Sequence, residues 1–374
     1  MGGQGPPGGA TAGSGPHPGG AVTQRRRKPP ARPGDLPPLH AALVTLEGVP
    51  DRSALDAGLD ALLTEASDEA TAAELRQARE ARSIERARYY VTRLRRGLEE
   101  LRTGPDNDLD LARWKTLDHI HTDSLWLIAK RDRSGAHSAG YWGNFVPQIP
   151  QQMMLRYTKA GDVVLDTFAG SGTTLLEAQR LGRHVLGIEL QPAVAARTRA
   201  TVSAEPNPHD IRWAVAEGDC ATVDLPAALA GEGHASVQLV IMHPPYHDII
   251  RFSDDPRDMS NAPDVDGFLE MFRNAVRNAA AVLDPGRTLV VVIGDKYARG
   301  TWIPLGFQTM QVVLDEGLSL RSIVVKNFEE TTGKRTSREL WRYRALTGGF
   351  YVFKHEYVFI FRKPGKARAR SATT

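Results

Sequence analysis

The chain has 374 residues, a formal net charge of +3 and a single cysteine, Cys220. A net charge this small gives no information about binding partners. A single cysteine excludes an internal disulfide and a cysteine-rich zinc site. No run approaches the ~18 apolar residues of a membrane span, and the N-terminus lacks an apolar secretory signal. We therefore expect a cytoplasmic protein without a membrane anchor or a structural metal.

The first 140 residues differ in composition from the rest of the chain. Residues 1–38 are rich in Gly and Pro, carry a basic run at Arg25, and show no hydrophobic period, so they predict a disordered tail. Residues 39–140 are expected to be mainly helical, because leucines recur at helical spacing between 53 and 102. This region can pack on the main domain, recognise DNA or form a dimer. Residues 364–374 form a second basic tail.

From 141 to 363 the hydrophobic pattern alternates between strands and helices. This alternation predicts a Rossmann-like, doubly wound α/β fold with a mostly parallel sheet, preceded by the helical region. The last two strands are joined without a convincing helix, which predicts an antiparallel edge hairpin. The expected strands are 163–168, 184–189, 212–216, 237–242, 288–293, 319–326 and 356–362, and the expected helices are 174–181, 192–201, 268–283 and 307–316.

A glycine-rich turn follows the first of these strands. Gly170 and Gly172 let the backbone approach a ligand, and Glu189 ends the next strand, where a carboxylate can accept from a ribose diol. The third glycine of a dinucleotide fingerprint is replaced by Leu175, and no Gly-Lys-Ser/Thr is present. These features favour S-adenosylmethionine over NAD or ATP, with a plain strand–helix connection as the alternative. Asp219 either accepts from the adenine amino group or caps its own loop.

The sequence Asp166-Thr-Phe-Ala-Gly-Ser-Gly-Thr-Thr, followed by Gly187-Ile-Glu189, resembles motif I of the amino-directed DNA methyltransferases. These enzymes methylate N4 of cytosine or N6 of adenine. Residues 145–155 resemble motif X, which lies against the methionine end of the cofactor in that family. The resemblance covers about 141–363, and its motif order is similar to the gamma arrangement. It implies S-adenosylmethionine as cofactor, held by Asp166, Phe168, Ala169, Gly170, Ser171, Gly172, Glu189 and Asp219.

The apolar run 237–242 ends in His243-Pro244-Pro245-Tyr246. In the family, a side chain and a backbone carbonyl at this motif accept hydrogen bonds from the target amine, and the aromatic ring stacks on the flipped base. The resemblance therefore implies that Tyr246 stacks and that Pro244 supplies a carbonyl. Pro244 and Pro245 fix the backbone that aims these groups. Methyl transfer is then an in-line displacement governed by positioning.

The family has Asp, Asn or Ser where this chain has His243. A neutral imidazole can accept one hydrogen bond and take a proton, so we hypothesise that His243 accepts from the target amine. The alternatives are that His243 fills the strand end while the backbone acts, or that activity is lost. Ser tends to accompany cytosine N4, and Asp or Asn adenine N6. We favour cytosine N4 because the motif lacks an acidic or amide residue.

Basic residues after this motif predict contacts to nucleic acid, although a charged outer face of a packed hairpin fits equally. The expected partner is double-stranded DNA with its target base flipped, together with a cognate restriction endonuclease. Rival interpretations are a tRNA or other RNA amino-methyltransferase and a catalytically silent binding module. Cytosine-C5 methyltransferases attack the base with a cysteine that follows a proline. Cys220 follows Asp219 instead, so we do not expect covalent C5 chemistry. The predicted nucleic-acid contacts are Arg251, Lys334, Arg335 and Arg338.

Overall fold

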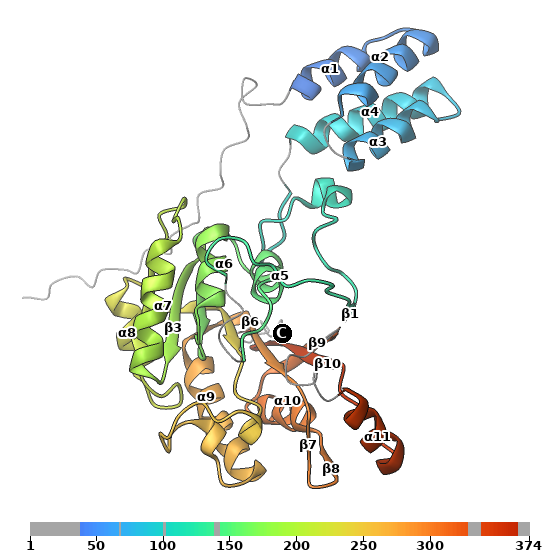
Figure 1. Cartoon of the computed structure of the whole chain (residues 1–374). Coiled ribbons are helices and arrows are strands. Elements are labelled where there is room, and N and C mark those ends of the chain that lie inside the picture. Colours follow the sequence, from blue (N-terminus) through green and yellow to red (C-terminus); the bar gives the residue numbers. More distant parts are fainter. Residues whose placement is uncertain (1–37, 67–68, 100–101, 138–142, 328–337, 366–374) are drawn as a thin grey trace, which may run out of the picture.

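The computed structural model describes residues 38–66, 69–99, 102–137, 143–327 and 338–365. The predicted tails, apart from residues 38, 364 and 365, lie outside these residues, as do the two predicted DNA contacts Lys334 and Arg335. Within them, no helix combines the length and the apolarity that crossing a membrane requires. The described chain forms a small helical unit and a larger α/β unit, joined by residues 102–124 (Figure 1).

The helical unit has a hydrophobic core of its own. Its helices are α1 (Pro38–Glu47), α2 (Arg52–Glu65), α3 (Glu69–Arg79) and α4 (Ile84–Glu99). Leu43, Leu55 and Leu75 are fully buried among these helices. Asp51 caps α2 by accepting from the backbone N–H of Ala54 at 2.9 Å.

Eight strands form the main sheet. In spatial order they are β1 (Leu125–Trp126), β9 (Ser319–Asn327), β10 (His355–Arg362), β6 (Leu283–Ile293), β5 (Val237–Met242), β2 (Val163–Asp166), β3 (His184–Glu189) and β4 (Trp213–Glu217). The five strands from β6 to β4 are parallel, whereas β10 is antiparallel to both β6 and β9. The predicted fold class, including the antiparallel hairpin at one end, is confirmed.

Helices cover both faces of this sheet, and successive strand residues point to opposite faces. Val163 and Leu165 of β2 pack in the core beneath one helical layer, whereas Val164 packs in the core beneath the other. The first layer contains α8 (Leu225–Gly231), α9 (Val265–Val282) and α10 (Leu305–Asp315), and the second contains α5 (Gln148–Tyr157), α6 (Thr173–Leu181) and α7 (Pro192–Ala204).

The expectation that β9 and β10 are joined without a helix is wrong, because α11 (Arg338–Gly348) lies between them. Its large apolar side chains, such as Tyr343 and Leu346, are exposed. The helix therefore lacks the apolar face from which a packed helix can be predicted in a sequence. The small hairpin of β7 (Lys296–Ala298) and β8 (Thr301–Ile303) was also not predicted.

The strand order reverses between β5 and β2. From β2 the chain proceeds to β3 on one side and later to β5 on the other. Loops at the carboxyl ends of two such strands leave a crevice that binds ligands in open α/β sheets. The glycine turn follows β2 and the Pro-Pro motif follows β5, so the fold brings the two predicted segments to the same crevice.

Candidate cofactor and target-base site

The glycine turn connects β2 to α6. Gly170 and Gly172 have φ values of +50° and +84°, a region that favours glycine. A Cβ on Gly172 would lie 2.8 Å from Cγ2 of Thr198, so packing against α7 also requires glycine there. Asp166 ends β2, is 1% exposed, and accepts from the backbone N–H of Phe168 at 2.9 Å.

Glu189 lies beside this turn at the end of β3. Its carboxylate accepts from the backbone N–H groups of Gly170 at 3.0 Å and Gln191 at 2.9 Å. Burial raises the pKa of Glu189 and raises that of Asp166 to about 6. Neither carboxylate has an ion-pair partner in the described part of the chain. Two buried carboxylates without a cation favour a positively charged ligand over a phosphate.

Asp219 lies in the loop after β4. Its Oδ1 accepts from the backbone N–H of Ala221 at 2.9 Å, and Thr222 Oγ1 donates to Oδ2 at 3.4 Å. The residue caps its loop, and it also lines a pocket of about 590 Å³ between this loop and α9. A role for Asp219 in adenine binding stays a prediction.

The Pro-Pro motif places His243 and Tyr246 directly beyond β5. The two rings meet edge to face with centroids 5.8 Å apart, and Nε2 of His243 lies 3.4 Å from the Tyr246 hydroxyl. Gly294 leaves room for the tyrosine ring, since a Cβ there would lie 2.9 Å from Cε2 of Tyr246. The hydroxyl donates to Oε2 of Glu356 at 2.8 Å.

The segment that precedes α5 links the two loops. Phe145 is the first residue of the segment that resembles motif X, and Asn144 comes directly before it. Ser171 of the glycine turn donates to Oδ1 of Asn144 at 2.7 Å. The ring of the next residue, Phe145, meets the His243 ring edge to face with centroids 4.8 Å apart. Residues 144–145 thus contact both the predicted cofactor loop and the predicted catalytic corner.

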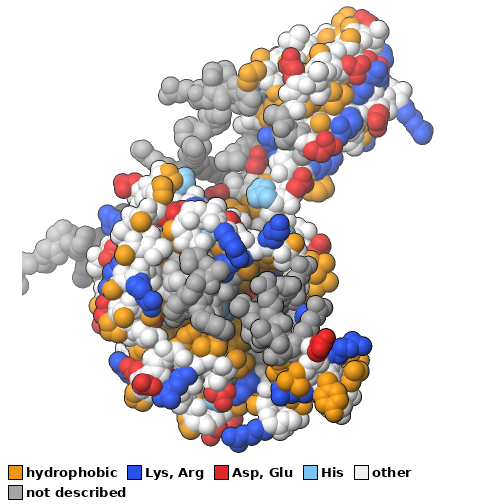
Figure 2. Space-filling view, in the orientation of Figure 1, with side chains coloured by type: hydrophobic (Ala, Val, Ile, Leu, Met, Phe, Trp, Pro, Cys, Tyr) orange, Lys and Arg blue, Asp and Glu red, His pale blue; other side chains and the backbone are white. Residues whose placement is uncertain are grey.

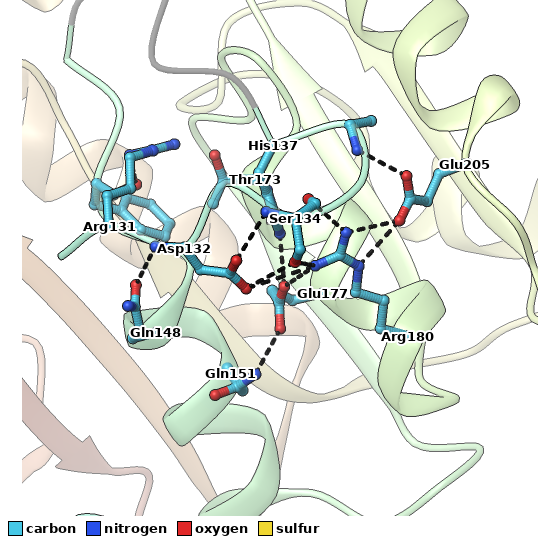
Figure 3. A network of polar contacts seen from close by, with 12 residues as sticks. Arg131, Asp132, Ser134, His137, Gln148, Gln151, Thr173, Glu177, Arg180 and Glu205 are labelled. Carbon is cyan, nitrogen blue, oxygen red and sulfur yellow. Dashed lines mark hydrogen bonds and ion pairs between the residues drawn. The ribbon is translucent and has the colours of Figure 1, made fainter.

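A polar network holds residues 131–137, the strap, against α6 and the end of α7 (Figure 3). Nε2 of His137 lies 2.6 Å from Oε1 of Glu177, and both side chains are at most 1% exposed. Arg180 donates to the backbone oxygen of Ser134 at 2.8 Å and to Glu205 at 2.7 Å. Arg131 of the strap also donates to the backbone oxygen of Phe145 at 2.6 Å, so the strap contacts the Asn144–Phe145 bridge directly.

The residues after the corner serve the local structure. His247 has a φ of +53°, and its ring lies 3.0 Å from the Ala262 carbonyl oxygen and 2.9 Å from Nζ of buried Lys296. Arg251 is exposed and pairs with Asp254 at 2.8 Å. Arg338 begins α11. Contacts of Arg251 and Arg338 with nucleic acid remain predictions.

Three residues at this site were not identified from the sequence: Asn144, Lys326 and Glu356. For Lys326 and Glu356, the sequence feature that could have identified them is a charged residue at the end of an apolar strand, as in Val-Val-Lys326 and Glu356-Tyr-Val-Phe. Such charges are rarely buried unless they are paired. In the described residues, no cluster of three or more His, Cys, Asp or Glu is placed to hold a metal ion.

The order of the strands, with two loops at the point where that order reverses, is typical of α/β proteins that bind a nucleotide-like cofactor. A family model described as DNA methylase matches residues 85–198 and 237–373. The chain therefore belongs to this DNA methylase family.

Curated relatives match over short segments. The chain is 34% identical over 70 residues to the type II methyltransferase M.MjaII of Methanocaldococcus jannaschii, covering 18% of this chain and 13% of the relative. It is 37% identical over 68 residues to M.BglI of Bacillus subtilis, covering 18% of each chain. It is 42% identical over 55 residues to M2.DpnII of Streptococcus pneumoniae, covering 15% of this chain and 20% of the relative. The matches thus span a fifth or less of these relatives.

Among solved structures, TrmN from Thermus thermophilus is similar with a TM-score of 0.36 and 20% identity, covering 59% of this chain and 49% of that one. Family membership agrees with the predicted cofactor, S-adenosylmethionine. The residues fit it, because Glu189 can accept from ribose hydroxyls and the two uncompensated carboxylates suit a sulfonium and an ammonium. When bound, this cofactor supplies an electrophilic methyl group.

Proposed function

We propose that this chain transfers a methyl group from S-adenosylmethionine to an exocyclic amino group in double-stranded DNA, with cytosine N4 as the favoured target. The observation that carries the proposal is the pairing of the glycine turn and the His243–Tyr246 corner on either side of the strand-order reversal, bridged by Asn144 and Phe145. A cofactor at the first loop and a base at the second would be neighbours.

Each group at the corner has a task in this reaction. The amine nitrogen is a weak nucleophile because its lone pair is conjugated with the ring. His243 and the Pro244 carbonyl accept its N–H bonds, which directs the lone pair toward the methyl carbon. Tyr246 stacks on the base after it has left the helix. The preference for cytosine rests on the missing acidic or amide residue at position 243.

The helical unit supports DNA as substrate. A groove of about 580 Å³ between α3 and α4 is lined by Arg76, Arg82, Arg86, Tyr90 and Lys115, among others. On the face drawn in Figure 2, Lys and Arg side chains lie on both units, interspersed with Asp and Glu side chains. Cations spread in this way suit a DNA backbone that runs along both units. A cognate restriction endonuclease remains an expectation from the family resemblance.

The test is to express the chain in a methylation-free host and sequence its DNA with single-molecule kinetics that distinguish N4-methylcytosine from N6-methyladenine. We expect N4-methylcytosine in a short recognition sequence, and no modification with His243→Ala. N6-methyladenine would overturn the choice of base. An unmodified genome from a protein that binds S-adenosylmethionine would favour RNA as substrate or a silent binding module, and full activity of His243→Ala would exclude the proposed acceptor.

A further inference from the structure

A buried relay of polar groups extends from β9 to the catalytic corner. Nζ of Lys326 lies 3.2 Å from Oε1 of Glu356, and the two side chains are 5% and 4% exposed. They are cross-strand neighbours on β9 and β10. The other carboxylate oxygen of Glu356 receives the Tyr246 hydroxyl at 2.8 Å, and that hydroxyl lies 3.4 Å from Nε2 of His243.

The charges in this relay determine the direction of its hydrogen bonds. Oε1 of Glu356 pairs with the Lys326 amine and Oε2 faces the Tyr246 hydroxyl, so Glu356 is the acceptor toward Tyr246. Tyr246 must then donate its single proton to Glu356, which leaves only lone pairs on its oxygen. The contact with His243 is a hydrogen bond only if Nε2 carries a proton and donates.

A neutral imidazole has one N–H, and burial above all lowers the pKa of His243 to about 4. The ring is therefore neutral near pH 7, and a proton on Nε2 leaves Nδ1 with a free lone pair. Nδ1 has no hydrogen-bond partner among the residues that the structure describes. Burial and Glu356 also raise the pKa of Tyr246 well above its usual value of 10, so the hydroxyl keeps the proton that it donates.

We infer that Glu356, acting through the Tyr246 hydroxyl, fixes His243 as the Nε2–H tautomer, so that Nδ1 is the atom that accepts the target amine. This inference rests on the proposed function. Glu356 is a positioning residue, since it acts through Tyr246, and Lys326 is its cross-strand ion-pair partner. The relay explains how an imidazole can serve where the family has Asp, Asn or Ser.

The same tautomer accounts for the proton that the reaction releases. The amine nitrogen bonds to the methyl carbon while the carbon–sulfur bond breaks and leaves its electron pair on sulfur. The nitrogen then carries an extra proton, and such a cation is a far stronger acid than an imidazolium. The proton passes to Nδ1 of His243 and from there to water, which restores the neutral ring.

The test compares two tyrosine hydroxyls on the full-length protein. Tyr246→Phe keeps the ring and removes the relay. The control, Tyr357→Phe, removes a hydroxyl that contacts Asp295 at 3.2 Å and His355 at 3.1 Å, outside the relay. Two-bond ¹H–¹⁵N NMR of the histidine rings reports the tautomer without DNA, and the His243 signals are assigned by their loss in His243→Asn.

We expect Nε2–H in the wild type and in Tyr357→Phe, and a mixture of tautomers in Tyr246→Phe. We also expect kcat to fall about tenfold in Tyr246→Phe, the loss of roughly one hydrogen bond, with the Kd for S-adenosylmethionine unchanged. A wild-type His243 protonated on Nδ1, or a Tyr246→Phe ring with an unchanged tautomer, would overturn the inference.

A second variant tests Glu356 without leaving a buried unpaired charge. In Glu356→Gln/Lys326→Met the glutamine amide can donate to Tyr246, which reverses the relay. We expect His243 to shift toward the Nδ1–H tautomer, and an unchanged ring would count against Glu356. A chain with the predicted tautomers that methylates no DNA would overturn the proposed function and leave the relay standing.

Discussion

At the scale of single residues, the site contains two buried carboxylates beside the glycine turn. Asp166 and Glu189 are 1% and 7% exposed and have no ion-pair partner in the described chain. Burial raises the pKa of both, because it disfavours the ionised form. Such groups destabilise the ligand-free fold and are retained where a ligand compensates them.

Asp166→Asn should therefore stabilise the protein without cofactor. With a folded pKa of about 6 and an unfolded value near 3.9, the folded state binds the proton more tightly. Stability is then lost as pH rises from about 4 to 6. We expect the variant to raise the free energy of unfolding by about 1–3 kcal/mol at pH 7.5 and by roughly half as much at pH 5.

Urea denaturation of wild type and variant at both pH values checks this expectation, and isothermal titration should show weaker binding of S-adenosylmethionine to the variant. A stability difference that is the same at pH 5 and pH 7.5 would contradict it, because the effect would then not come from ionisation of Asp166.

At the scale of elements, the sequence predicted the strands that are buried on both sides. β3 and β5 begin and end at the predicted residues, since the apolar run of β3 ends at Glu189 and that of β5 ends before His243-Pro244. It did not predict α11, whose apolar side chains are exposed, or β1, which has only two residues. Elements that bury little apolar surface have no strong periodic pattern.

The candidate site shows the same division. The two loops could be predicted because each follows an apolar strand and carries residues with distinct chemistry. Glu356 could not, since its position opposite Lys326 depends on how β9 and β10 pair. The bridge from Asn144 to Ser171 likewise depends on the path of the strap, for which the sequence has no repeating pattern.

The strap should depend on Arg180, which contacts Ser134, Glu205 and the buried Glu177. Arg180→Ala removes these contacts and leaves Glu177 with less compensation, so we expect a loss of about 2–3 kcal/mol in stability. Binding of S-adenosylmethionine should also weaken, because the strap leads to the Asn144 bridge.

Thermal denaturation and titration with the cofactor measure both effects. The control is Arg251→Ala, whose ion pair with Asp254 joins two exposed side chains; its effect on stability should stay below about 0.5 kcal/mol. Equal losses in the two variants would show that the strap has no special role.

At the scale of the whole molecule, the helical unit and the α/β unit have separate hydrophobic cores. Residues of α3 and α4 line the groove, and these helices lie at the end of the molecule opposite the β7–β8 hairpin (Figure 1). The proposed DNA substrate would then bind to two units, one that carries the chemistry and one that adds phosphate contacts.

Replacing Arg82 and Lys115 with glutamine should weaken DNA binding without changing the affinity for S-adenosylmethionine. Two lost phosphate contacts should lower the slope of log K against log salt by about 2 units. Fluorescence anisotropy at several salt concentrations measures this slope. Arg299→Gln, on the β7–β8 turn, is the control, and an unchanged slope in the double variant would exclude the groove from the DNA interface.

The place of β10 in the sheet affects how the protein is made. β10 lies between β6 and β9, and it carries Glu356. During synthesis β9 leaves the ribosome before β10, and until β10 inserts beside β6 it can pair only with the two-residue strand β1. Until then, Tyr246 lacks its carboxylate partner. A nascent chain that already has both loops is therefore expected to lack the oriented His243 ring, so full DNA modification activity requires that residues 355–362 have joined the sheet.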